Sequence, residues 1–359
     1  MTFRLPPSSA HRWMNCALYM QASQKYPEQP EGDEAREGTC AAWVAQLVLT
    51  GEAANCAAVV GKTHENGWLV TAEMARDVQG YVDNVLSRGG TTSCERTVTL
   101  STDPLIAGTL DLAATVSDRH TLYVDDLKYG RRIVEVRKNP QLIIYAAALL
   151  RNYAPGTFNF VQLGIYQPRA FHHKGTYRTW VVETVILLRM ADEIIAAGRR
   201  CYEPDPIATA GEWCEYCPIA TRCETLAQTN YARIAHVASQ HHRNMTLAEL
   251  SRELDFLEEA DKTLKARKKA VEAEAEQRAR REIIPGRHLK AGNGKRKFNV
   301  PGEVIRMVTG IDPYEKQELC TPAELERRGA SPEAVKALSF TPSTGHKLVK
   351  VDIAEAFGE

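Results

Sequence analysis

The apolar positions of the first 90 residues recur every three to four residues, which is the period of an amphipathic helix. This spacing predicts helices over residues 10–26, 33–49 and 71–88. Thr71 is a suitable N-cap for the third of them. The chain is therefore expected to begin with helices that each present one apolar face.

From residue 95 the pattern changes to segments rich in Val, Thr, Leu and Tyr, which favour β-strands. Strands are expected at 95–101, 105–116, 121–128, 158–167 and 177–188, with helices at 139–152 and 189–200. This order of helices, strands, a helix and strands is typical of a mixed α/β core.

The pattern changes again after residue 200. Residues 201–229 are rich in Cys and Pro and indicate a segment dominated by loops. Thr246 and Glu249 form a capping box that starts a long helix reaching Glu282. Its leucines form a partial heptad seam that fades after Leu264, which favours a helical arm with one packed face over an extended coiled coil.

The C-terminal part predicts a small α+β region. Residues 286–300 indicate a basic hairpin that turns near Asn293. Thr321 and Ser331 each stand directly before a proline, which predicts the starts of two short helices.

Composition narrows the class of protein. Of the 359 residues, 44% are hydrophobic and 25% are charged, as in a soluble globular protein. No apolar run reaches 18 residues and the N-terminus lacks the apolar region of a signal peptide, so we expect a cytoplasmic protein with no membrane partner. Basic and acidic residues number 45 each. This balance argues against a protein that coats nucleic acid non-specifically, but it allows an enzyme with local basic patches.

The candidate chemistry centres on Asp111, Asp126 and Lys128. Asp111 lies on one expected strand and the other two lie on the next, so a hairpin would bring the three together. Asp126 and Lys128 are two residues apart and therefore share one face of a strand. The alternative for such a group is a solvated surface ion pair, which contributes little to stability.

This group of residues suits metal-assisted hydrolysis of a phosphodiester. The two carboxylates and the backbone carbonyl of Leu127 offer the oxygen ligands that Mg²⁺ prefers. Lys128 can orient or deprotonate a metal-bound water, or stabilise the charge that develops on the phosphate. Gln141 and Tyr145 are four residues apart on the expected helix, so they share a face from which they can contact a phosphate or the lysine.

Asp111, Asp126-Leu127-Lys128 and Gln141-x-x-x-Tyr145 together resemble the motifs of the PD-(D/E)XK nuclease superfamily, specifically its RecB-like branch. The resemblance implies a restriction-endonuclease-like fold, in which helices flank a mixed central sheet. It also implies that the two aspartates bind Mg²⁺ or Mn²⁺, that the lysine is catalytic, and that the Gln/Tyr motif organises the site.

One position departs from this family pattern. RecB-like enzymes often carry a metal-binding His on an early helix, and Ala42 stands at that position here. Three explanations stay open: the metal site lacks this ligand, Glu37 or Glu95 takes its place, or catalysis is weakened.

A second candidate site is a C-x₂-C-x₅-C pattern formed by Cys214, Cys217 and Cys223. Three thiols in ten residues are more typical of a metal site than of core packing, and the fourth ligand could be local or the distant Cys16. Four thiolates suit either Zn²⁺ or an iron–sulfur cluster. The remaining cysteines are expected to be buried core residues: Cys40, Cys56, Cys94, Cys201 and Cys320.

The family resemblance favours the iron–sulfur cluster. A subset of RecB-like nucleases, including AddB, has one Cys before the nuclease core and three after it, and these bind a [4Fe–4S] cluster. The resemblance therefore implies Cys16 as the fourth ligand. Such a cluster would join the two ends of the domain and close a very long loop.

Further basic residues are candidate DNA contacts. They are Arg169, Lys295, Arg296 and Lys297, and the alternative for each is a polar, solubilising loop or hairpin. The whole-length pattern also resembles a phage-associated RecB-like exonuclease family. That resemblance implies work on DNA in replication or recombination, beside a single-strand-binding or recombination protein, in a bacterial or phage-infected cell.

These observations predict a nuclease domain over residues 1–230, a helical arm over 231–285 and a small α+β domain over 286–359. The expected function is Mg²⁺- or Mn²⁺-dependent hydrolysis of DNA, by an exonuclease. The alternative is a catalytically degenerate DNA-binding or recombination scaffold that keeps a structural metal cluster.

Overall fold

The computed structural model describes residues 3–26, 32–89, 91–93, 96–110, 113–116, 121–172, 174–239, 244–293, 297–298, 300, 302–315, 318–327, 329–340 and 343–350. The chain divides into two compact units, Met1–Ala270 and Val271–Glu359. The boundary between them falls inside the long helix, whereas the sequence suggested boundaries near residues 230 and 285.

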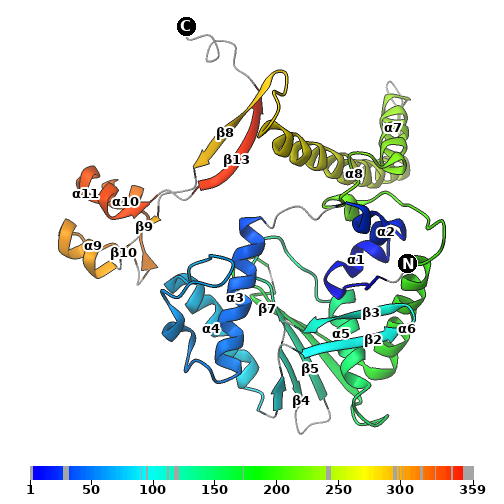
Figure 1. The fold of residues 1–359 in the computed structure, drawn as a ribbon, viewed down its shortest axis with the longest axis horizontal. Helices are drawn as coiled ribbons and strands as arrows, with labels where there is room; N and C mark the ends of the chain where they lie inside the picture. The colour runs from blue at the N-terminus through cyan, green and yellow to red at the C-terminus, as the bar shows by residue number, and fades with distance from the viewer. Residues whose placement is uncertain are drawn as a thin grey trace. The chain divides into compact units, whose positions relative to one another are not determined.

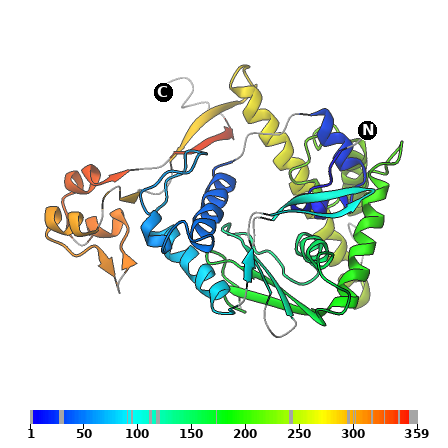
Figure 2. The same cartoon turned by 60° about the horizontal axis from the view of Figure 1, so that its bottom comes forward.

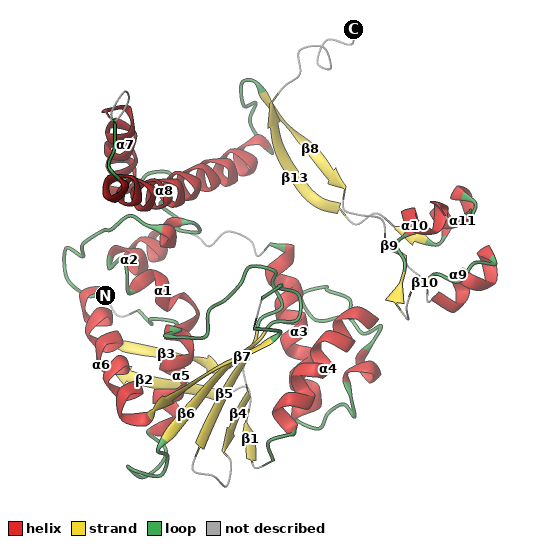
Figure 3. Ribbon diagram, turned by 180° about the vertical axis from the view of Figure 1, so that it is seen from behind, coloured by secondary structure: helices red, strands yellow, loops and turns green. Residues whose placement is uncertain are grey.

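A mixed sheet forms the centre of the first unit (Figures 1 and 3). Its described strands lie in the order β1 (Thr91–Ser93), β4 (Ala113–Val116), β5 (Thr121–Leu127), β6 (Phe160–Tyr166) and β7 (Tyr177–Glu183). Only β5 and β6 among them run parallel, and helix α5 (Pro140–Leu150) connects the two as a parallel pair requires. The predicted mixed α/β fold class is confirmed.

Helices cover both faces of this sheet (Figure 2). One core joins α5 to α1 (Ala10–Trp13) and α6 (Thr184–Arg200), and the other joins α3 (Asp33–Leu49) to α4 (Ala72–Leu86). Successive side chains of β5 alternate between these cores, because a strand has a period of two. Val124 packs on the α5 side and Leu127 packs on the α3–α4 side.

Two expected elements are each divided in the structure. The expected strand 105–116 is two strands, of which β3 (Leu105–Leu110) pairs with β2 (Arg96–Thr102) and β4 pairs with β5. The expected helix 10–26 is α1 followed by α2 (Leu18–Lys25), and Cys16 lies in the turn between them. Continuous apolar spacing did not reveal either break. Short 3₁₀ turns lie at Pro7–Ser9, Cys56–Val59 and Glu212–Cys214.

Helices α7 (Glu224–Ser239) and α8 (Leu247–Ala279) follow the cysteine-rich loop. The capping box is present, since Thr246 Oγ1 accepts from the Glu249 N–H at 3.3 Å and Glu249 Oε2 accepts from the Thr246 N–H at 2.9 Å. The long helix was expected to pack through its leucines, and this prediction is wrong. Small side chains on α8, namely Ala260, Thr263 and Ala266, are buried, while the leucine seam is exposed.

The second unit is a small α+β region with its own core around Ile305, Leu325 and Val335. Its helices are α9 (Gly302–Thr309), α10 (Pro322–Arg327) and α11 (Pro332–Ala337), and the last two confirm the predicted starts. Its strands are β8 (Arg287–Asn293), β9 (Lys297–Phe298), β10 (Tyr314–Glu315), β11 (Glu318–Leu319), β12 (Ser339–Phe340) and β13 (Ser343–Lys350).

The expected basic hairpin over 286–300 is wrong. β8 pairs with β13 and β9 pairs with β12, so both partners come from the C-terminal end of the unit. A local turn signal cannot identify a partner strand that is some 50 residues away, because that pairing depends on tertiary contacts. Within the described residues, none of the helices combines the length and the apolar character needed to span a bilayer.

Candidate active site and cysteine cavity

The end of β5 brings Asp126 and Lys128 together. Asp126 Oδ2 lies 2.6 Å from Lys128 Nζ. The aspartate side chain is only 4% exposed, whereas the lysine side chain is 27% exposed. A largely buried carboxylate therefore lies beneath an ammonium group that solvent or a substrate can reach.

Helix α5 begins beside this ion pair. Asn139 Oδ1 caps the helix by accepting from the backbone N–H groups of Gln141 at 3.0 Å and Leu142 at 3.3 Å. This cap places Gln141 in the first turn, where its Oε1 accepts from Lys128 Nζ at 3.1 Å. The lysine is thus held from two elements, by a carboxylate on β5 and an amide on α5.

Tyr145 lies one turn further along α5 and connects the helix to the β2–β3 hairpin. Its side chain is buried, and its hydroxyl donates to the Thr109 backbone carbonyl at 2.8 Å. Asp111, the other expected metal ligand, lies outside the described residues. The residues two positions to either side of it are described: Thr109 contacts Tyr145, and Ala113 pairs with Asp125 of β5.

The neighbouring Asp125 belongs to a buried network that the sequence analysis missed. Asp125 is fully buried on the opposite face of β5. Its carboxylate accepts from the Arg88 guanidinium and from the Tyr177 hydroxyl, the latter at 2.7 Å. Burial lowers the pKa of Arg88, but the Asp125 carboxylate raises it more, so that it stays above its usual value. A second Asp beside Asp126 was the only hint of this network in the sequence.

Glu37 and Arg169 form another contact near the end of β6. Their side chains are paired at 2.6 Å and each is 19% exposed. The Arg169 guanidinium also lies over the Tyr129 ring, 4.6 Å from its centroid, and Tyr129 donates to Asp77 Oδ2 at 3.1 Å. Burial and the Asp77 carboxylate raise the pKa of Tyr129. Arg169, an expected DNA contact, is therefore engaged within the protein in this structure.

Some of the remaining residues that the sequence suggested lie within the described part of the structure and others do not. Ala42 is half-buried on α3 and offers no ligand atom. Lys297 lies on β9, opposite Phe340 of β12. Lys295, Arg296 and Glu95 lie outside the described residues.

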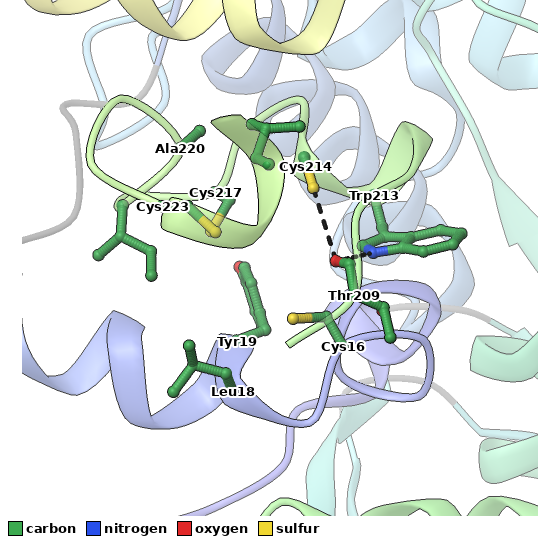
Figure 4. A pocket seen from close by; sticks show the side chains of 11 residues that line it. Cys16, Leu18, Tyr19, Thr209, Trp213, Cys214, Cys217, Ala220 and Cys223 are labelled. Carbon is green, nitrogen blue, oxygen red and sulfur yellow. Dashed lines mark hydrogen bonds between the residues drawn. The ribbon is translucent and has the colours of Figure 1, made fainter. Parts of the chain in front are cut away.

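The four cysteines singled out from the sequence line one cavity (Figure 4). Cys16 comes from the turn between α1 and α2, and Cys214, Cys217 and Cys223 come from the loop before α7. Figure 4 shows their sulfur atoms facing this common space, together with the ring of Tyr19. Most of the remaining lining is apolar: Leu18, Trp213, Ile219, Ala220 and Leu226.

The thiols also act on one another electrostatically. Burial raises the pKa of Cys217 to about 12, and the other three thiols of the set contribute to the increase. Burial likewise raises the pKa of Cys214. By contrast, Cys201 makes core contacts, since its thiol donates to the backbone carbonyls of Trp13 at 3.4 Å and Ala197 at 3.8 Å.

The four thiols that line this cavity are a donor set that suits either Zn²⁺ or an iron–sulfur cluster. Among the described residues, no three His, Cys, Asp or Glu side chains are placed so that they could hold one metal ion. A zinc ion needs its sulfur ligands about 2.3 Å from a single point.

Charged contacts hold the cysteine loop to its surroundings. Glu215, between two of the cysteines, accepts from Arg132 and from Lys269 of α8, each at 2.6 Å. Burial opposes ionisation of Glu215, but these two cations outweigh it and hold the pKa of the carboxyl below its usual value. Arg267 of α8 also donates to the Ala220 carbonyl. The loop is thus bound both to the segment after β5 and to α8.

Comparison with known proteins gives one family and a distant structural likeness. The family described as "Protein of unknown function (DUF2800)" matches residues 3–350. The structure described as "Crystal structure of SSO0001" is similar with a TM-score of 0.29 and 11% sequence identity, covering 62% of this chain and 86% of that chain.

Proposed function

The chain belongs to the DUF2800 family, and we propose that it is a metal-dependent DNA nuclease of the RecB-like PD-(D/E)XK type. The single observation that carries the proposal is the contact of Lys128 with both Asp126 and Gln141. The three residues come from motifs that are 13 residues apart, yet their functional atoms meet at one point at the end of β5.

The different exposure of the Asp126 and Lys128 side chains supports a catalytic role for the pair. A surface ion pair contributes little to stability and would leave both partners in water. Here the carboxylate is nearly buried and the ammonium is held by a second, neutral partner. A lysine fixed in this way is pre-organised to stabilise negative charge on a phosphate.

The proposed reaction is hydrolysis of a phosphodiester. A water molecule attacks phosphorus and loses its proton to solvent, a new P–O bond forms, the bond to the leaving sugar oxygen breaks, and that oxygen takes up a proton from a second water molecule. Asp126, with Asp111 and the Leu127 carbonyl, would hold Mg²⁺ or Mn²⁺, which would acidify the attacking water and offset the charge on the phosphate. Lys128, as an ammonium, orients the attacking water and stabilises the charge on the phosphate, and Gln141 fixes the position of Lys128.

The cysteine cavity completes the proposal. Cys16, Cys214, Cys217 and Cys223 would hold a [4Fe–4S] cluster, with Zn²⁺ as the alternative. The cluster would join the N-terminal helices to the loop before α7 and would act structurally. In this reading the protein is an exonuclease that works on DNA ends beside a single-strand-binding or recombination protein.

A non-catalytic DNA-binding scaffold is the second candidate. Two observations favour it: the Ala42 side chain carries no ligand atom, and Glu37, an acidic residue on the same helix, is paired with Arg169. Such a scaffold would keep the cluster and the fold but lack a complete metal site.

Purified protein with end-labelled linear DNA and Mn²⁺ distinguishes the two candidates. We expect cleavage by the wild type, lost by about 10²–10⁴-fold in Lys128→Ala and reduced in Gln141→Leu. Circular DNA in the same assay reports whether an end is required. Lys138→Ala, which removes a lysine ten residues away, serves as the matched control. Equal cleavage by wild type and Lys128→Ala, or none by the wild type with either metal, would contradict the proposal.

A further inference from the structure

A group of exposed apolar side chains in the described part of the first unit lies on α7 and α8. Eight large side chains on the part of these helices that lies in the first unit are 38% to 86% exposed: Tyr231, Ile234, Val237, Leu247, Leu250, Leu254, Leu257 and Leu264. An amphipathic helix normally buries its apolar stripe against another element. Here the stripe lies beside the contacts that hold the two helices together and remains exposed.

The two helices run antiparallel. Asn230 Nδ2 donates to the Thr263 carbonyl at 3.3 Å, and His236 Nε2 lies 3.2 Å from Glu253 Oε2. Residues later in α7 therefore contact residues earlier in α8. Small and polar side chains make this contact, because Ala260 and Thr263 are buried while the leucines are not.

Helical geometry places the exposed apolar residues of both helices on the same side. Ile234 follows the contact residue Asn230 by four positions, and Leu264 follows the contact residue Ala260 by four. When two helices are antiparallel, residues that follow a contact residue by the same number of positions on each helix are rotated toward the same side of the helix pair. The hairpin thus presents one broad apolar face, like half of a four-helix bundle.

The charges on α8 identify what can cover this face. Residues 249–261 hold six acidic residues and one arginine, a net charge of −5, and residues 262–269 hold five basic residues and no acidic one, a net charge of +5. Glu258 and Asp261 flank the leucines in the first segment, and Lys265 and Lys268 flank them in the second. Asp261 and Lys265, where the two segments meet, also pair with each other within the helix at 2.5 Å. A helix with this division is complementary to a second copy of itself placed antiparallel.

We propose that the apolar face of the α7–α8 hairpin is a self-association surface, on which a second copy of this chain docks antiparallel to form a four-helix bundle. A two-fold axis places each acidic segment against the basic segment of the other copy. A parallel arrangement would oppose like charges and is disfavoured. This proposal is independent of the nuclease proposal, because it concerns assembly and neither candidate site.

The mass of the full chain in solution tests the surface. Sedimentation equilibrium over a concentration series should show a dimer for the wild type and a monomer for the double variant Leu254→Glu, Leu257→Glu. Val185→Glu on α6 is the matched control, since Val185 is 53% exposed on another helix, and it should remain dimeric. A monomeric wild type at every concentration, or a dimeric leucine variant, would overturn the proposal.

A pair of charge variants tests the orientation without removing any leucine. One variant carries Glu258→Lys and Asp261→Lys, and the other carries Lys265→Glu and Lys268→Glu. Each alone opposes like charges across the two-fold axis and should be monomeric, while an equal mixture should form a heterodimer. A mixture that stays monomeric while each variant keeps wild-type helicity by circular dichroism would overturn the charge pairing.

Discussion

Two neighbouring aspartates show how strand geometry separates structural from chemical roles. Asp125 and Asp126 are adjacent in the chain, but they face opposite sides of β5 because strand side chains alternate. Asp125 is enclosed by Arg88 and Tyr177, where its charge is paired and hydrogen-bonded. Asp126 is paired with a lysine that remains accessible. The first therefore supports the fold and the second supports the proposed chemistry.

This separation predicts opposite effects of two otherwise identical substitutions. Asp125→Asn leaves the buried Arg88 charge without its partner, so the free energy of unfolding should fall by about 3–5 kcal/mol. Asp126→Asn should abolish Mn²⁺-dependent cleavage and change stability much less. Urea unfolding and the end-labelled DNA assay measure the two effects. Equal loss of stability in both variants would show that Asp126 is a structural residue as well.

At the scale of elements, the cysteine cavity depends on a break that divides one helix into two. Cys16 reaches the cavity from the turn between α1 and α2, and the other three thiols reach it from the loop before α7. Direct hydrogen bonds reinforce this meeting of chain segments, since Gln21 of α2 donates to the backbone carbonyls of Cys201 at 3.2 Å and Glu203 at 2.9 Å. A metal group here would connect segments nearly 200 residues apart.

Removal of one thiol should therefore affect both colour and stability. Cys16→Ser should abolish absorbance near roughly 400 nm in anaerobically purified protein and should lower the unfolding temperature, because the closed loop is opened. Cys56→Ala is the control, since Cys56 is fully buried elsewhere and should leave the absorbance unchanged. Retained absorbance in Cys16→Ser would remove Cys16 from the ligand set, and a colourless wild type that contains zinc would favour the alternative metal.

At the scale of the whole molecule, both candidate sites lie in the first of two compact units. Asp126, Lys128, Gln141 and all four cavity cysteines precede residue 270, where the units divide. The second unit has its own core and carries part of the basic segment that the sequence suggested for DNA contact.

A fragment that ends at Ala279, the last residue of α8, tests this division. It should retain the proposed Mn²⁺-dependent cleavage and the absorbance of the proposed cluster, because the elements that build both candidate sites are intact. Its affinity for DNA should be lower and less dependent on salt than that of the full chain if the basic residues contact phosphates. Fluorescence anisotropy at several salt concentrations measures this, and an unchanged affinity would exclude a DNA contact in the second unit.

Local features of the sequence predicted much of the fold. The capping box at Thr246, the proline starts of α10 and α11, and the extent of α3 could all be predicted because each depends on residues within one or two turns. The meeting of Asp126 with Lys128 follows from a strand period of two. The contact of Gln141 with Lys128 required a motif resemblance as well.

The sequence by itself determined the mixed α/β class, the residue types of both candidate sites and the order in which they occur. Only the tertiary structure decided that Asp125 is buried against Arg88, that β8 pairs with β13, and that α8 buries its alanines and exposes its leucines. The physical reason is the distance along the chain over which each effect acts. Periodicity and capping act between neighbours along the chain, whereas burial and strand pairing depend on partners that the folded core brings from distant segments.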